Sequence, residues 1–267
     1  MVPSNFRHGE PPRLIATTAL SFEQRGARAA LLASSADAAR EPLEFASRLC
    51  EAQARIALPD SLTGRLTKDI HALSPQLVLR AAAEHGPELL AVEADKRLHD
   101  DAHTAETRLL VYWGGGARED YLTRAILQPY VETLRLRNIT PDRLHLRGHC
   151  PFCGGAVWIS TRKPAHDAES GFRYLSCALC SLEWPVNRIQ CPSCFEEDPH
   201  KLSVFHTDAH PNVRIETCET CCRYIKSIDL TLDARPVPIV DDLLSIAMDL
   251  WAVEQGNTRI EPGLAGL

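Results

Sequence analysis

Eight of the ten cysteines form four pairs in which two residues separate the partners. Shifting the first two pairs by 41 positions reproduces the last two, so the pattern C-x2-C-x23-C-x2-C occurs twice in tandem. We interpret this repetition as a duplicated structural unit. The four pairs are Cys150 and Cys153, Cys177 and Cys180, Cys191 and Cys194, and Cys218 and Cys221.

This spacing is typical of a metal site. A C-x2-C pair on a tight turn directs both sulfurs to one point, and two such turns complete a tetrahedral tetrathiolate around one ion. Pro151 and Gly154 suit the first turn, because proline presets one backbone dihedral and glycine tolerates a positive φ. We therefore expect two ions. Site 1 is predicted from Cys150, Cys153, Cys177 and Cys180, and site 2 from Cys191, Cys194, Cys218 and Cys221.

Other chemistry for these thiols is less well supported. A redox dithiol of the thioredoxin type is expected once, near a βαβ pattern, whereas four pairs occur here without one. Units of this size bury little apolar surface, so a bound ion would contribute about 10 kcal/mol or more to folding each one. Zinc and iron both accept four thiolates, and the spacing leaves that choice open. Cys222 could exchange as a ligand or be a free thiol, and His149 and His206 are expected to be spectators.

Composition narrows the classes of function. The 267 residues carry a net charge of -6, and residues 146–235 hold ten Lys and Arg against eleven Asp and Glu. Binding to nucleic acid depends mainly on neutralised phosphates, so we expect no nucleic-acid partner. The first residues lack the apolar core of a signal peptide, and no apolar run reaches the roughly 18 residues of a membrane span. We expect a cytoplasmic protein with no membrane insertion, in which stable disulfides are rare.

The segment before the cysteines is predicted to be helical. Its Ala, Leu, Glu and Arg content is high, and apolar residues recur at intervals of three and four. Residues 113–117, with three glycines, predict a turn, and Pro129 predicts a kink or two consecutive helices because proline lacks a backbone donor. The expected helices cover residues 22–34, 41–58, 74–86 and 118–138.

After Gly148 the pattern changes to short β-branched and aromatic stretches separated by polar turns, which indicates strands. Residues 236–256 again predict a helix, whose apolar stripe should pack back on the body. The expected fold class is α+β: an N-terminal all-helical domain, two tandem rubredoxin-like or zinc-ribbon-like tetracysteine modules and a C-terminal helix. The expected boundaries are 1–145 for the helical domain, 146–186 and 187–235 for the modules, and 236–267 for the helix and tail.

Two stretches resemble a known family. Residues 172–194 and 216–230 are similar to the FdhE-type formate dehydrogenase accessory proteins, including the run RYL-x-C-x-x-C-x-x-EW. The resemblance implies a cytoplasmic assembly factor, or chaperone, that binds the catalytic subunit of a formate dehydrogenase and assists its maturation before export or activation. It also implies iron at the C-x2-C motifs. The residues that it suggests for partner binding are Trp184, Tyr224, Lys226, Asp241 and Asp242.

The second unit departs from a rubredoxin pattern, because Phe195 and Cys222 stand where glycine or another small residue would be easier to accommodate. No nucleophile motif, Walker motif or dinucleotide fingerprint occurs, so we expect a protein that is not an enzyme. Two further hypotheses remain open: a rubredoxin-like electron-transfer component that contains iron, and a zinc-ribbon interaction module with another partner.

Overall fold

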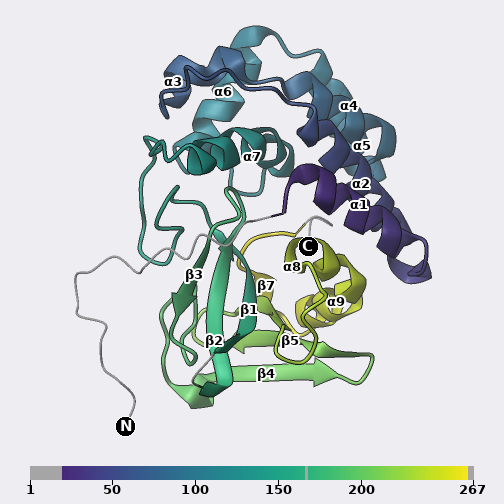
Figure 1. The fold of residues 1–267 in the computed structure, drawn as a ribbon, viewed down its shortest axis with the longest axis vertical. Coiled ribbons are helices and arrows are strands. Elements are labelled where there is room, and N and C mark those ends of the chain that lie inside the picture. Colours follow the sequence, from purple (N-terminus) through teal and green to yellow (C-terminus); the bar gives the residue numbers. More distant parts are fainter. Residues whose placement is uncertain (1–19, 166–167, 264–267) are drawn as a thin grey trace.

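The computed structural model describes residues 20–165 and 168–263 (Figure 1). Helices occupy the N-terminal half of the chain, and a mixed sheet with a short helical segment occupies the rest, so the expected fold class is confirmed. The N-terminal helices are α1 (Phe22–Ala33), α2 (Arg40–Ala54), α3 (Leu66–Asp69), α4 (Pro75–His85), α5 (Glu88–Leu98), α6 (Ala102–Trp113) and α7 (Tyr121–Leu136), with 3-10 turns at Asp37–Ala39 and Ile70–Ala72.

Local sequence explains where α1 begins. The Ser21 hydroxyl accepts a hydrogen bond from the backbone N–H of Gln24, and the Gln24 side chain accepts one from the N–H of Ser21. This reciprocal pair satisfies two of the backbone donors that a helix leaves unpaired at its start. The cap fixes the start of the first helix without help from the rest of the fold.

Helix α7 is the central helix of this half, and it lies between the other helices and the cysteine-rich part (Figure 1). Of the two outcomes expected at Pro129, a kink or two consecutive helices, the second is wrong, because one helix runs from Tyr121 to Leu136. Proline cannot donate to the carbonyl four residues earlier, which here belongs to Ala125. The side chain of Gln53 on α2 donates to that carbonyl at 2.8 Å, so the acceptor that Pro129 leaves unpaired is satisfied from a neighbouring helix.

One sheet joins the two cysteine-rich units. Its strands lie in the order β3-β2-β1-β6-β5-β4, and β7 pairs with the start of β6. Within each unit the neighbouring strands are antiparallel, whereas β1 of the first unit and β6 of the second pair in parallel. The strands are β1 (Val157–Ala165), β2 (Ala168–Cys177), β3 (Glu183–Val186), β4 (Leu202–Thr207), β5 (His210–Cys218), β6 (Arg223–Asp229) and β7 (Thr258–Arg259), and a 3-10 turn, Pro199–Lys201, precedes β4.

The C-terminal helical segment is divided into three pieces rather than being one helix over 236–256. They are α8 (Pro238–Asp241), a 3-10 turn (Asp242–Ser245) and α9 (Ile246–Glu254). The 3-10 turn changes the helical phase, so Leu250 of the expected apolar stripe is 48% exposed while Asp249 is buried. Helix α8 packs on α1 and β1, and α9 packs on β5 and β7.

Candidate metal centres

The four C-x2-C pairs form four turns of the same shape. In each turn the residue after the second cysteine has a positive φ, and its N–H donates to the carbonyl of the first cysteine at 2.8–3.2 Å. Only glycine adopts this backbone conformation without steric cost. The second unit keeps the turn although its sequence departs from the rubredoxin pattern. The four residues are Gly154 with φ 64°, Ser181 with φ 55°, Phe195 with φ 67° and Cys222 with φ 53°.

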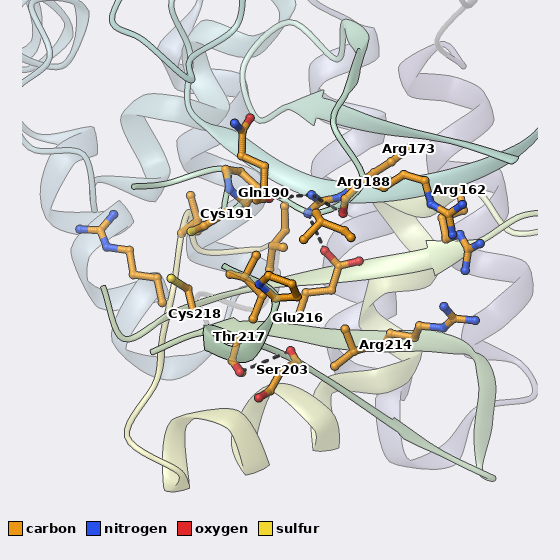
Figure 2. Close-up of a pocket in the computed structure, with 18 residues that line it drawn as sticks. Arg162, Arg173, Arg188, Gln190, Cys191, Ser203, Arg214, Glu216, Thr217 and Cys218 are labelled. Carbon is orange, nitrogen blue, oxygen red and sulfur yellow. Dashed lines mark hydrogen bonds and ion pairs between the residues drawn. The ribbon is translucent and has the colours of Figure 1, made fainter. Parts of the chain in front are cut away.

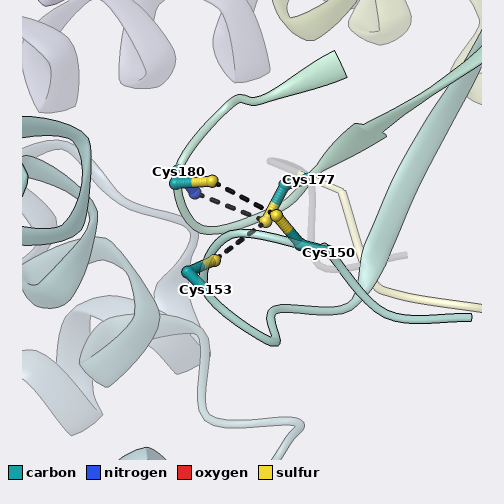
Figure 3. Close-up of side chains that lie close together, drawn as sticks. All are labelled: Cys150, Cys153, Cys177 and Cys180. Carbon is teal, nitrogen blue, oxygen red and sulfur yellow. Dashed lines mark hydrogen bonds between the residues drawn. The ribbon is translucent and has the colours of Figure 1, made fainter. Parts of the chain in front are cut away.

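Site 1 lies where β2 and the loop before β1 meet α7, and its four cysteines are all fully buried (Figure 3). The Sγ atoms of Cys150 and Cys180 are 3.5 Å apart, and so are those of Cys153 and Cys177. A tetrahedron of sulfurs about 2.3 Å from a central ion has edges of about 3.8 Å, whereas a disulfide bond is about 2.05 Å long. The spacing fits four thiolates around one ion and excludes disulfides.

Site 2 repeats this geometry in the other half of the sheet. Cys191 and Cys221 have their sulfurs 3.7 Å apart, and Cys194 and Cys218 have theirs 3.5 Å apart. All four ligand atoms lie within 4.8 Å of one another, as they also do in site 1. The two clusters could therefore hold two metal ions, grouped as the repeat predicts.

The donor chemistry of site 1 also fits a cation. Burial raises the pKa of Cys153 and of Cys180, and hydrogen bonds with Cys150 and Cys177 raise both further, whereas hydrogen bonds from its neighbouring thiols outweigh burial and lower the pKa of Cys150. Four thiolates this close together repel one another, so a cation between them would stabilise the fully ionised cluster. The backbone N–H groups of Leu179 and Cys180 donate to Cys177 Sγ at 3.3 and 3.4 Å. Zinc and iron both suit this donor set.

The helical domain holds site 1 through the turn at residues 177–181. Gln128 and Arg135 on α7 donate to the carbonyls of Ala178 and Cys180, at 2.9 and 2.8 Å. The Ser181 hydroxyl donates to Glu132 at 2.6 Å. Glu132 itself forms a buried bidentate pair with Arg25 of α1. Because these contacts connect α1, α7 and a metal-binding turn, site 1 is part of the interface between the helices and the sheet.

Site 2 has fewer neighbours. Cys191 and Cys218 are buried, whereas Cys194 and Cys221 are half-buried. Cys222 is exposed, and its sulfur lies 3.8 Å from the carbonyl oxygen of Glu219 rather than in the cluster. Solvent therefore reaches site 2 but not site 1.

The two histidines beside the cysteines lie outside both clusters of possible ligands found in the described residues. His149 has its Nδ1 atom 3.3 Å from the carbonyl oxygen of Arg147. His206 is exposed on β4.

The five residues suggested for partner binding are placed inside the fold, each with at most 5% of its surface exposed. Arg28 of α1 forms a bidentate pair with Asp241. Tyr224 donates to Asp249 at 3.0 Å. These positions give no support to direct contact with a partner and instead tie the C-terminal segment to the body. The five are Trp184, Tyr224, Lys226, Asp241 and Asp242.

Lys226 is the centre of a buried ionic network, two members of which, Asp249 and Arg259, were not predicted from the sequence. Its ammonium group contacts Asp249 and lies 3.0 Å from Asp242, and Arg259 of β7 pairs with both aspartates. Two cations and two anions balance, as buried charges require. Burial raises the pKa of Asp249, whereas for Asp242 the opposing charges of Arg259 and Lys226 outweigh burial and lower it. Asp249 and Arg259 carry no sequence signal besides their charge in apolar surroundings.

Taken together, the fold defines a class: a helical domain that carries two tandem tetrathiolate modules on a shared sheet. Family models agree with this class. Residues 149–188 match the model "FdhE, central domain", and residues 189–264 match "FdhE, C-terminal domain". Over residues 149–264 the chain is therefore similar to the central and C-terminal domains of FdhE proteins.

Curated relatives match about half of the chain or less. A "Protein FdhE homolog" of Aquifex aeolicus is 33% identical over 140 residues, which are 52% of this chain and 49% of that protein. One of Pseudomonas aeruginosa is 39% identical over 121 residues, 43% of this chain and 38% of that protein. The matched segment thus spans half or less of these relatives' length.

A solved structure extends the likeness in fold. The crystal structure of the FdhE protein from Pseudomonas aeruginosa superimposes with a TM-score of 0.66, covering 96% of this chain and 98% of that one. The sequence identity is 23%, so this match shows the shared fold, helical half included. Among the helices of the described residues, none combines the length and apolar composition that a membrane span requires.

Proposed function

We propose that this protein is a cytoplasmic accessory protein, without catalytic activity of its own, that binds the catalytic subunit of a formate dehydrogenase and assists its maturation. The observation that carries the proposal is the pair of FdhE domains, each holding a complete tetrathiolate cluster. In this proposal the chain binds two ions, iron or zinc, through the eight paired cysteines. The domain boundaries in the proposal are those expected from the sequence.

The architecture supports a binding role. The described residues include several buried ion pairs, and the two clusters hold the turns of the two halves of one sheet. A rigid scaffold loses little conformational entropy when it docks on another protein. The helical half and the sheet can then hold an unfinished subunit while its own cofactors are inserted.

Co-purification tests the proposal. The tagged chain, expressed anaerobically together with the formate dehydrogenase catalytic subunit of the same organism, should retain that subunit on an affinity column. A mature, cofactor-loaded subunit should be retained less than the immature one, since an assembly factor releases its finished product. Equal recovery with an untagged control, or no recovery under anaerobic conditions, contradicts the proposal.

A second candidate is a rubredoxin-like electron-transfer component, and the exposure of site 2 favours it. Electron transfer requires a metal close to the surface, and the half-buried Cys194 and Cys221 provide that access. The measurement is a reversible loss of visible absorption when anaerobically purified, iron-containing protein is reduced. A colourless protein that contains only zinc excludes this candidate and leaves the first in place.

A further inference from the structure

The sheet has two different faces, because successive side chains of a strand point to opposite sides. On one face, apolar residues of β1, β5 and β6 pack against α9, and Phe205 of β4 stacks on Trp251. The alternate positions of the same strands carry arginine: Arg162 on β1, Arg214 on β5 and Arg223 on β6. The side opposite α9 is thus rich in guanidinium groups.

A cavity of about 240 Å³ opens on this arginine-rich face, at the junction of the two modules. Its walls come from β1, β2, β4, β5, β6 and the connector that begins site 2 (Figure 2). Figure 2 shows Arg162, Arg173 and Arg188 gathered at one end and Cys191 and Cys218 at the other. Five arginines line the cavity against one carboxylate, that of Glu216: Arg162, Arg173, Arg188, Arg214 and Arg223.

Two of these arginines are neighbours on adjacent strands, since Arg162 of β1 is in register with Arg173 of β2. Like charges in directly opposite positions destabilise a sheet. Glu216 offsets this at Arg173, with 2.5 Å between oxygen and nitrogen, and Asp229 is shared by Arg162 and Arg214 at 3.2 Å each. Structural contacts use part of this charge, since Arg173 also donates to the Ser160 hydroxyl and to the Gln190 carbonyl, but five arginines against these two carboxylates still leave a surplus of positive charge in a chain of net charge -6.

We propose that this cavity binds an acidic peptide segment, with the carboxylates at the arginine end. Arginine presents paired donors that match a carboxylate, and apolar side chains such as Ile189 and Val204 complete the wall for the residues between. The volume is below the roughly 300–1,000 Å³ of small-molecule pockets, so side chains of a peptide fit it better than a whole cofactor. At the other end Arg223 lies in register with Cys218 and offers a further contact for an acidic side chain of the peptide.

The source of the peptide rests on the proposed function: we assign it to a surface segment of the immature client subunit. Peptide binding itself can be measured without that subunit, so the site and its client are tested separately.

The probe is a short fluorescein-labelled peptide of alternating glutamate and leucine, and its control has glutamine for every glutamate. Fluorescence anisotropy with the full metal-loaded chain should show binding of the acidic peptide that weakens as salt is added. The glutamine peptide should bind at least about tenfold more weakly, as the loss of charge-assisted hydrogen bonds predicts.

The matched variants are R188Q/R223Q, which removes two exposed arginines of the cavity, and R55Q/R80Q, which removes two exposed arginines of the helical domain. The first should weaken peptide binding about tenfold with metal content and melting temperature unchanged, and the second should leave it unchanged. If the double variant loses stability, the single variant R223Q replaces it. R223Q should weaken peptide binding less than the double variant does.

Equal binding of the two peptides, or equal weakening by both variants, overturns the proposal. A single-stranded RNA oligonucleotide that displaces the acidic peptide at lower concentration also overturns it, in favour of a nucleic-acid site. If R188Q/R223Q loses the peptide but captures the client subunit as well as wild type, the client assignment falls. If wild type binds the peptide but captures no client, the proposed function falls and the site stands.

Discussion

Phe195 and Cys222 occupy left-handed backbone positions that glycine fills in the first turn of site 1. Phe195 uses its side chain, since the guanidinium of Arg147 lies 4.1 Å from its ring centroid. Cys222 has an exposed sulfur that makes a weak hydrogen bond to the carbonyl of Glu219. The contacts of the Cys222 side chain therefore compensate for little of the steric cost of its positive φ.

Replacing Cys222 with glycine should stabilise the protein. Relief of the left-handed strain is worth about 1 kcal/mol, which corresponds to a rise of about 2–4 °C in Tm for a chain of this size class. Both ions should be retained, because Cys222 is outside site 2. The measurements are calorimetry and metal content at equal protein concentration. Loss of one ion per chain in Cys222→Gly would show instead that Cys222 is a ligand.

Lys226 is the residue on which the C-terminal network depends, since it is fully buried beside two aspartates. Lys226→Met leaves those carboxylates with Arg259 alone, and breaking a buried ion pair in this way costs about 3–5 kcal/mol. The free energy of unfolding in urea measures the loss. The control Lys201→Met removes an exposed lysine 3.5 Å from Glu196 and should cost less than about 1 kcal/mol. Equal effects of the two variants would contradict the structural role of the network.

At the scale of elements, α7 connects the helices to site 1 through a chain of two buried glutamines. Gln53 donates to Gln128 at 2.8 Å, and Gln128 donates to the carbonyl of Ala178 between two cysteines of site 1. Pro129 makes this chain necessary, because it leaves the Ala125 carbonyl for Gln53 to satisfy. The hydrogen bonds of Gln53 and Gln128 next to Pro129 therefore connect the helical domain to site 1.

Gln128→Ala should weaken this junction. It leaves the buried Ala178 carbonyl without a donor, at a cost of about 1–3 kcal/mol in the free energy of unfolding. Chelator should then remove the ion of site 1 faster, with the ion of site 2 unaffected. The control Gln255→Ala changes an exposed residue after α9 and should alter neither quantity. If the chelator removes the ion of site 1 at an unchanged rate in Gln128→Ala, the hydrogen bonds of the two glutamines do not stabilise site 1.

The sequence predicted those elements whose signals are local. The C-x2-C turns and their grouping follow from spacing alone, and α1, α2 and α4 follow from apolar periodicity. Features that depend on distant partners were not predictable. Gln53 repairs the backbone around Pro129, and β1 pairs in parallel with β6, which brings arginines from four strands to one cavity. The C-terminal helix was mispredicted because Asp242 and Asp249 bury their charges against Lys226, which lies on a strand.

At the scale of the whole molecule, the two clusters differ in how much of the fold depends on each of them. Site 1 is fully buried and bonded to α7, whereas site 2 closes the outer module and is open to solvent. Cys177→Ser/Cys180→Ser should therefore unfold the first module and expose the buried face of α7, with a large loss of overall stability. Cys191→Ser/Cys194→Ser should leave the helical domain and site 1 folded with one ion per chain.

Hydrogen exchange of the α7 amides, measured together with metal content, distinguishes the two variants. The wild type should also lose its ions to a chelator in two phases, the fast one absent from Cys191→Ser/Cys194→Ser, because only site 2 is reached by solvent. Protection of α7 that survives in Cys177→Ser/Cys180→Ser would show that the helical domain stands without site 1. In that case the junction would be a contact between independent domains, and an ion bound at site 1 could be lost or exchanged during client binding without unfolding the helices.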